Sequence, residues 1–370
     1  MRVVITGADG FIGKNLRIRL TELGYNNTVC LTRSSTNTEF QQALDDADFV
    51  FHLAGVNRPE NPDDFLVGNA KLTQELCVAL QKKDRKVPVV FASSAQAGLD
   101  NSYGQSKLAA EKALHCYSVD TSAPTYIYRL NNVFGKWCRP NYNSAVATFC
   151  FNMTRGLPVK VHDAASPLKL VFVDDVVNSF IGMLSTPSIA GGFSEVSPVY
   201  STTVGEVVEI LGSFTQSRVS LLSERVGVGF IGALYSTYIS YLPPKAFDYC
   251  LPVHKDPRGE FAEMLKTPDC GQFSYFTAHP GVTRGEHYHH SKTEKFLVIR
   301  GTAHFAFRNI VTNETHELVV HGGKAHVVET APGWIHNITN RGKDELIVML
   351  WANNVFDLQK PDTIATKVSI

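Results

Sequence analysis

The chain lacks a net charge: its 35 Lys and Arg residues balance 35 Asp and Glu residues. Nucleic acid and anionic membrane surfaces are therefore not its expected main partners. It also lacks any Cys-x-x-Cys pair, because its seven cysteines are scattered. That usage favours reduced thiols in a cytoplasmic compartment over a disulfide scaffold.

Long apolar runs are absent as well. The most apolar late stretch, residues 226–242, contains Ser236, Thr237 and Ser240, so it predicts a buried or interfacial helix and no membrane insertion. The first residues show no apolar signal-peptide core; they predict a buried strand that runs into a glycine turn. We therefore expect a cytoplasmic protein.

A chain of 370 residues is long enough for two domains. Short Val-, Ile- and Phe-rich runs alternate with helix-period segments in the first half, which predicts βαβ units and a doubly wound parallel sheet. After the double proline at Pro243 and Pro244, β-branched runs are broken by Gly, Pro, Asn and His. This pattern of short β-branched runs and turn residues predicts an all-β sandwich or barrel. The sequence thus predicts an α/β domain over 1–243 and an all-β domain over 244–370. The expected strands are 3–6, 29–32, 49–53, 89–92 and 125–130, then 296–300, 302–307, 317–320, 325–329 and 345–350.

Three glycines form a turn between the first expected strand and an amphipathic helix over 14–23. Gly7, Gly10 and Gly13 give the spacing GxxGxxG. Glycines permit a tight turn and let backbone N–H groups reach a pyrophosphate at the start of the helix. The context on both sides favours a dinucleotide site over a chance glycine turn.

The second expected strand ends without an acidic residue. A carboxylate there would bind a ribose 2′-hydroxyl, whereas Arg33 can pair with a 2′-phosphate. This favours NADPH over NADH; the alternative is that Arg33 is only a solvated loop charge.

Tyr103 and Lys107 are four residues apart, which places them on one face of a helix. An ammonium near a phenol lowers the phenol pKa, so the tyrosine can exchange a proton with a carbonyl or alcohol oxygen. Ser93 and Ser94 precede them at the end of an expected strand, where a hydroxyl can hydrogen-bond to the same oxygen.

With these motifs in order, residues 1 to about 243 resemble the extended short-chain dehydrogenases/reductases, most of which act on nucleotide sugars. The segments 52–55, 129–135 and 172–176 resemble further motifs of that family, and Asn69 stands where the family has Asn. The resemblance implies a catalytic trio of Ser94, Tyr103 and Lys107. The cofactor contacts that it implies, together with Tyr103 and Lys107, are Gly7, Asp9, Gly10, Phe11, Ile12, Gly13, Arg33, Leu53, Ala54, Gly55 and Asn69.

The second half carries a histidine pattern. His287 and His289 alternate on an expected strand and so project to one side. With Glu294 and the later His336 they make a three-His, one-carboxylate set for a divalent metal. Zinc, iron, nickel and manganese all accept such ligands; zinc is the expected ion.

The spacing of these residues resembles the two motifs of the cupins. The segments 256–261, 284–288 and 294–298 also resemble the cupin-fold 4-keto-6-deoxy-sugar 3,5-epimerases, which need no metal and whose base is a His matching His287. The two resemblances compete for His287, as ligand or as general base. We favour the ligand for His287, with His290 as a further candidate for either role and assigned here to catalysis.

An epimerase-like cupin and a reductase in one chain could act in sequence on the same keto-sugar. The ketone at C4 of a keto-sugar acidifies the C3 proton, so a base can remove it and an acid can return it from the other face. Hydride transfer from NADPH to C4 would then fix the new configuration.

This domain order resembles the bifunctional capsular polysaccharide enzymes of bacteria over essentially the whole chain. That resemblance implies a homodimer and a UDP-2-acetamido-2,6-dideoxy-4-hexulose substrate, a UDP-linked 4-keto-6-deoxy-N-acetylhexosamine. The product would be UDP-N-acetyl-6-deoxy-L-talosamine, on the route to UDP-N-acetyl-L-fucosamine.

Three other interpretations remain open at this point. The cupin could be a non-catalytic module for dimerisation or sensing. The first domain could be a redox sensor, although sensors of that kind lack the Tyr/Lys pair. The chain could also be an epimerase or dehydratase that holds NAD permanently.

Overall fold

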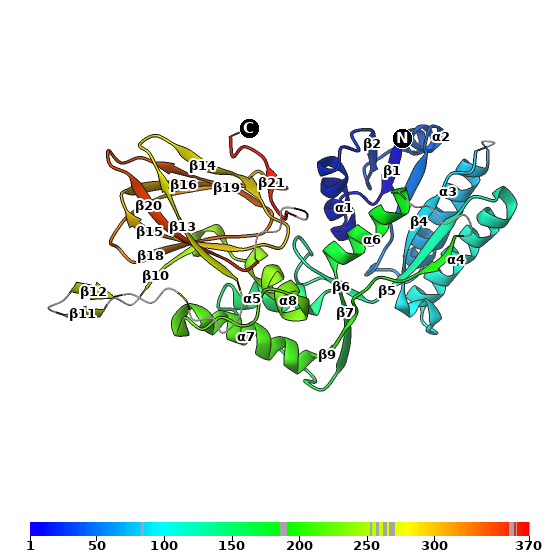
Figure 1. Ribbon diagram of the computed structural model, residues 1–370. Coiled ribbons are helices and arrows are strands. Elements are labelled where there is room, and N and C mark those ends of the chain that lie inside the picture. Colours follow the sequence, from blue (N-terminus) through cyan, green and yellow to red (C-terminus); the bar gives the residue numbers. More distant parts are fainter. Residues whose placement is uncertain are drawn as a thin grey trace. The chain divides into compact units, whose positions relative to one another are not determined.

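A computed structural model describes residues 1–82, 85–185, 191–251, 254–256, 259–261, 265, 271–354, 359 and 361–369. The chain divides into two compact units (Figure 1). The first unit is Met1–Ser144 with Leu168–Thr202, and the second is Ala145–Pro167 with Thr203–Ile370. The epimerase-like segment 256–261 lies partly outside the described residues, which omit 257 and 258.

A six-stranded parallel sheet forms the centre of the first unit, as the alternating pattern predicted. Its spatial order is β2-β1-β3-β4-β5-β8, and the neighbouring strands pair in parallel. Most of these strands are short apolar runs buried on both faces, which is what a parallel sheet covered by helices requires. Their bounds are β1 (Val3–Thr6), β2 (Thr28–Leu31), β3 (Phe49–His52), β4 (Val89–Ser94), β5 (Thr125–Leu130) and β8 (Gly192–Ser194).

Helices cover both faces of this sheet. Val50 of β3 belongs to a buried cluster with Leu114 of α4 on one face. The next residue, Phe51, points the other way and stacks on Phe180 of α6. The helices of this unit are α1 (Phe11–Glu22), α2 (Asn37–Asp45), the π-helical turn η1 (Leu66–Lys71), α3 (Leu72–Gln81), the 3₁₀ turn η2 (Ala95–Gly98), α4 (Ser102–Thr121) and α6 (Val173–Ser185). A smaller sheet joins β6 (Asn132–Phe134), β7 (Pro167–Phe172) and β9 (Tyr200–Thr203).

Two five-stranded antiparallel sheets face each other in the second unit and form the predicted cupin-like sandwich (Figure 1). Aromatic side chains fill the space between them: the ring of Phe296 lies 5.9 Å from that of Phe305 and 6.1 Å from that of His336. One sheet is β10 (Asp248–Cys250), β18 (His326–Thr330), β15 (Glu294–Arg300), β20 (Leu346–Ala352) and β13 (Gln272–Ala278). The other is β17 (Thr315–His321), β16 (Thr302–Asn309), β19 (Trp334–Asn340), β14 (Thr283–Tyr288) and β21 (Ile364–Ala365); β11 (His254–Asp256) pairs with β12 (Gly259–Phe261).

Among the residues that the structure describes, three α-helices belong to the second unit, and the apolar stretch at 226–242 supplies one of them. It forms α8, whose Leu234, Tyr235 and Ile239 are buried, as predicted for a buried helix. No helix in the described ranges is long and apolar enough to cross a bilayer. The double proline separates α8 from β10, where antiparallel structure begins. The domain boundary predicted at 243/244 stays a prediction, because the division into compact units places these three helices with the strands that follow them. The helices are α5 (Ala145–Met153), α7 (Val204–Ser220) and α8 (Gly229–Ser240), and the 3₁₀ turn η3 (Pro244–Ala246) follows them.

Candidate functional sites

The glycine turn lies at the switch point of the parallel sheet, where β1 pairs with β2 on one side and with β3 on the other. The chain leaving β3 is bonded to the end of β1: the Leu53 and Ala54 N–H groups donate to the Thr6 carbonyl and Thr6 Oγ1, both at 3.2 Å. Gly7 has a φ of +68°, and a Cβ there would stand 2.7 Å from the Ala54 Cα. Only glycine permits this approach. Open α/β sheets bind ligands in the crevice at such a point.

The first turn of α1 presents its backbone N–H groups to that crevice. Gly10 is the N-cap, and no side chain within the described chain caps this helix end. Gly13 is buried, and a Cβ there would lie 2.3 Å from the Gly7 carbonyl oxygen, so it allows the helix to start directly against the turn. Uncapped N–H groups and the helix dipole together favour a phosphate.

Arg33 is the second residue after the end of β2, next to the same turn. The Ala8 N–H donates to the Leu31 carbonyl at 3.1 Å, which ties the end of β2 to the glycine turn. Arg33 itself is exposed. Asp9, on the other side of the turn, is exposed and pairs with Arg17 at 3.4 Å.

The predicted catalytic residues meet at the end of β4. Ser94 is the last residue of that strand, and Tyr103 lies in the first turn of α4. Burial raises the pKa of Tyr103, while a hydrogen bond with the Ser94 side chain acts in the opposite direction. Lys107 is buried, its Nζ donates to the Ala92 carbonyl at 3.0 Å, and burial lowers its pKa to about 8. The hydroxyl and phenol predicted to act together are thus in contact.

Close backbone packing holds α4 in this place. A Cβ on Gly104 would lie 2.3 Å from the Gln96 carbonyl oxygen, so the first turn of α4 rests directly on η2. Asn69 Nδ2 donates to Ser106 Oγ at 2.9 Å and to the Val56 carbonyl at 3.1 Å. The side chain of Asn69 therefore fixes the loop after β3 against α4. The sequence interpretation gave Gly104 and Ser106 no role.

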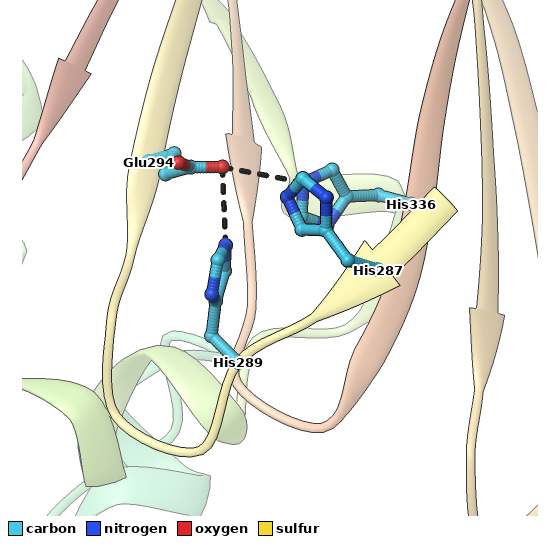
Figure 2. A group of neighbouring side chains, drawn as sticks. All are labelled: His287, His289, Glu294 and His336. Carbon is cyan, nitrogen blue, oxygen red and sulfur yellow. Dashed lines mark ion pairs between the residues drawn. The ribbon is translucent and has the colours of Figure 1, made fainter. Parts of the chain in front are cut away.

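Four side chains converge between the two sheets of the second unit. Figure 2 shows His287 and His289 from β14 and the loop after it, Glu294 from β15 and His336 from β19, all turned toward one point. Their ligand atoms all lie within 4.8 Å of one another. The predicted set of four is therefore brought together.

A β-bulge aligns two of these histidines. Gly285 pairs with Asn337 and His287 pairs with His336, so Glu286, with a φ of +58°, is an extra residue on β14. The bulge sets the ring centroids of His287 and His336 4.7 Å apart. Alternation then brings His289 to the same side, with its ring 4.9 Å from that of His287.

The donor geometry fits a divalent cation. Glu294 Oε2 lies 3.3 Å from His289 Nε2 and 3.2 Å from His336 Nε2, yet among the described residues neither nitrogen has a hydrogen-bond partner. A tetrahedral shell with bonds of about 2.0–2.2 Å has edges of about 3.4 Å, close to these separations. Burial and the neighbouring histidines lower the pKa of His287 to about 3, which keeps its imidazole neutral.

A cavity of about 250 Å³ opens onto this group. Phe276, Phe296 and Tyr275 contribute apolar lining, and Arg284 also lines the cavity, with its guanidinium 5.2 Å from the ring centroid of Phe276. The polar end contains His287, Glu294 and His336. The cavity has the form of a small-molecule site, mostly apolar with a few convergent polar groups.

His290, the further candidate for the base, is not one of the four converging side chains. Its ring centroid is 5.6 Å from that of Tyr288, and it is not among the residues that line the described cavity. Two residues without a role in the sequence interpretation, Lys292 and Asp362, contact the group instead. Asp362 is distant in sequence and carries no motif; Lys292 stands within the cupin motif, but spacing alone gave no reason to select it.

Comparison with known proteins agrees with this two-part architecture. Residues 3–192 match the NAD dependent epimerase/dehydratase family, and residues 254–364 match the polysaccharide biosynthesis C-terminal domain. A UDP-2-acetamido-2,6-beta-L-arabino-hexul-4-ose reductase of Pseudomonas aeruginosa is 53% identical over 368 residues, which cover 100% of this chain and 99% of that protein.

Solved structures give the same result. The capsular polysaccharide assembling protein CapF from Staphylococcus aureus matches with a TM-score of 0.68 and 42% identity, over 100% of both chains. A UDP-glucuronic acid 4-epimerase from Bacillus cereus, solved with NAD, matches over 65% of this chain and 96% of its own with a TM-score of 0.55. At 20% identity that match shows the fold alone. The chain belongs to the NAD dependent epimerase/dehydratase family, and a cupin-like domain follows the part that matches this family.

Proposed function

We propose that this protein is a bifunctional nucleotide-sugar enzyme that first inverts C3 of a UDP-2-acetamido-2,6-dideoxy-4-hexulose and then reduces its C4 ketone. The observation that carries the proposal is the presence of two separate sites in one chain. One is the Ser94–Tyr103–Lys107 group beside a dinucleotide crevice; the other is the His/Glu group at the end of an apolar cavity. The relative from Pseudomonas aeruginosa, similar over its full length, is a reductase of such a keto-sugar.

In the reductive step, bound NADPH would supply a hydride to C4, which breaks the C=O π bond and leaves an oxyanion. Tyr103 then donates its phenolic proton to that oxygen, and the hydrogen bond between Ser94 and Tyr103 orients the phenol. Lys107 supplies a buried positive charge on the same helix face, which favours the tyrosinate that remains.

In the epimerisation step, a base removes the C3 proton and an acid returns a proton from the opposite face, with no change in oxidation state. His287 lies in the cavity with a neutral imidazole, whereas His290 lies outside the lining; both stay candidates for the base. A divalent ion, with zinc expected, would supply positive charge next to the enolate oxygen. His287, His289, Glu294 and His336 would hold it. The product, UDP-N-acetyl-6-deoxy-L-talosamine, would lead to UDP-N-acetyl-L-fucosamine; we further propose a cytoplasmic homodimer.

Mass spectrometry in D₂O tests the order of the two steps. The UDP-linked 4-keto-6-deoxy-N-acetylhexosamine is incubated with the full chain, first without NADPH and then with it. We expect deuterium at C3 without NADPH, and a 4-alcohol that keeps this deuterium once NADPH is added. Reduction without deuterium at C3 would eliminate the epimerase and leave a reductase with a non-catalytic cupin.

Cofactor preference tests Arg33. In R33S we expect the ratio of kcat/KM for NADPH to that for NADH to fall about 10–100-fold, because hydrogen bonds to a charged phosphate contribute about 1.5–3 kcal/mol each. Steady-state rates with both cofactors give the ratio. R341S removes an equal charge from an exposed position in the second unit and serves as control. An unchanged ratio in R33S would assign the 2′-phosphate contact to another residue.

A further inference from the structure

The two oxygens of the Glu294 carboxylate face different partners. Oε2 points to His289 and His336, as Figure 2 shows, while Oε1 lies 2.8 Å from Lys292 Nζ. The side chains of Lys292 and Glu294 are 14% and 5% exposed, so solvent competes little for this pair. The ammonium therefore leaves a single oxygen of Glu294 directed to the point where the four side chains converge.

Asp362 holds the loop that carries Lys292. Its carboxylate accepts hydrogen bonds from the backbone N–H groups of His290, Ser291 and Lys292 at 2.7, 2.8 and 2.7 Å, and from Ser291 Oγ at 2.9 Å. One side chain from the far end of the chain thus satisfies three consecutive backbone donors. These contacts fix the turn between His289 and Glu294, which sets the separation of the two.

The backbone of Asp362 also acts on His289 directly. Its carbonyl oxygen contacts His289 Nδ1, and because a carbonyl only accepts, Nδ1 carries the proton. The lone pair of Nε2 is therefore free for a cation, on the side where Glu294 Oε2 lies. A hydrogen bond of this kind orients a ligating imidazole and raises its basicity.

The segment after Asp362 is bound to the other ligating strand. In β21, Ala365 pairs with His287. The Thr366 N–H donates to the Glu286 carbonyl at 2.8 Å, and the Val368 N–H donates to Glu286 Oε2 at 2.8 Å. Residues 362–368 therefore contact the bulge and the loop that together position three of the four converging side chains.

We infer that Lys292 and Asp362 are positioning residues of the metal centre, and that the C-terminal segment 362–368 is part of that centre. Lys292 directs one oxygen of Glu294 to the ion, and Asp362 fixes the tautomer of His289 and the turn between the two ligands. This inference rests on the proposed metal site and deepens it, since it names the groups that set its affinity.

Zinc affinity of the full-length apoprotein tests the inference. Metal is removed with a chelator, and Zn²⁺ is titrated back in competition with a chromogenic chelator. We expect D362A to bind Zn²⁺ about 10–100-fold more weakly, the usual effect of removing a group that supports a metal ligand. K292R, which keeps the charge beside Glu294, should bind Zn²⁺ within a few-fold of the unchanged chain. K343M and D344N change exposed residues of the same kinds and should bind as the unchanged chain does.

Cobalt provides a readout that a purely structural role would not change. With Co²⁺ in the site, the visible ligand-field bands of K292M should shift and weaken, because Glu294 can then turn both oxygens to the ion and raise the coordination number. Thermal unfolding of the metal-free variants shows whether the fold is retained. If D362A does not fold, K292M and D362N decide the question, since the asparagine turns an amide N–H₂ toward donors that need an acceptor.

The outcomes separate the inference from the proposal beneath it. If the unchanged chain takes up no Zn²⁺ and no Co²⁺, the metal centre itself is wrong. If the unchanged chain binds both ions, D362N binds Zn²⁺ equally well and the Co²⁺ bands of K292M are unchanged, the metal centre stands and the inference is overturned.

Discussion

Replacing Tyr103 by phenylalanine should lower the rate of NADPH-dependent reduction about 10²–10⁴-fold, the usual contribution of a positioned general acid. The change removes the group that protonates the new C4 oxygen. The phenyl ring can keep its place, since the ring of Tyr103 already packs 5.6 Å from that of Phe65. The measurement is single-turnover oxidation of NADPH with the keto-sugar, beside NADPH binding by fluorescence, which should not change.

Deuterium exchange gives the same variant a second, independent readout. Y103F should take up deuterium at C3 at the normal rate, because the cupin residues are untouched. Y117F is the matched control: it removes a phenol hydroxyl from the same helix, where Tyr117 donates to the Val87 carbonyl at 2.9 Å. It should cost about 1 kcal/mol of stability and no reduction rate. If Y103F reduced the sugar within a few-fold of the normal rate, another acid would have to protonate C4.

The parts of both sites that the sequence predicted are those set by local spacing. Tyr103 and Lys107 share a helix face because they are four residues apart, and His287 and His289 share a strand face because they are two apart. Gly7 could be recognised because a turn between a strand and a helix requires it. Such relations depend on backbone geometry within a few residues and are visible before any tertiary contact is known.

The residues that the sequence did not identify act across long separations. Asp362 reaches the loop at His290 from 72 positions away, and no local pattern marks it. The bulge at Glu286 depends on how β14 pairs with β19, which a single strand does not reveal. The grouping of α5, α7 and α8 with the antiparallel sheets also depends on packing. The residue pattern changes only at the double proline that follows these helices, so the sequence predicted them as part of the reductase domain.

One source of that grouping is a buried charge cluster between α7 and the cupin-like sheet. Glu329 of β18 lies between two cations: its Oε1 is 2.6 Å from Lys295 Nζ, and its Oε2 contacts Arg218 of α7. Lys295 also donates to the Tyr249 hydroxyl at 3.0 Å, and Arg218 donates to the Ala246 carbonyl at 2.7 Å. Glu329 and Lys295 are each 3% exposed. The carboxylate is thus the counter-charge for Lys295, which solvent hardly reaches, and for Arg218, whose side chain is 19% exposed.

Replacing Glu329 by glutamine should therefore destabilise the second unit by about 3–5 kcal/mol, since it leaves the buried Lys295 and the partly buried Arg218 without a counter-charge. For a unit of this size the midpoint of its thermal transition should fall by about 6–20 °C. E317Q is the control, because Glu317 contacts His304 at 3.1 Å with 66% of its side chain exposed and should change stability by less than about 1 kcal/mol. A loss of under 1 kcal/mol in E329Q would mean that water or a shift of α7 solvates the cations.

The double variant E329Q/K295M and the dependence of stability on pH distinguish two causes of the loss in E329Q: missing charge compensation and disturbed packing. Removing Lys295 as well leaves one uncompensated cation instead of two, so the double variant should lose about 0.5–3 kcal/mol less than the sum of the single losses.

Burial acts to raise the pKa of Glu329, but Arg218 and Lys295 outweigh it and hold that pKa below its usual range. A carboxyl whose pKa is lowered by folding stabilises the native state above its unfolded pKa of about 4.3, and the contribution is lost as pH falls through the lowered value. Between neutral pH and about pH 5 the stabilisation should therefore be complete, and below about pH 4 the difference between the unchanged chain and E329Q should shrink. A constant difference down to pH 3 would show that the glutamine disturbs packing and that charge compensation is not what holds α7 to the sheet.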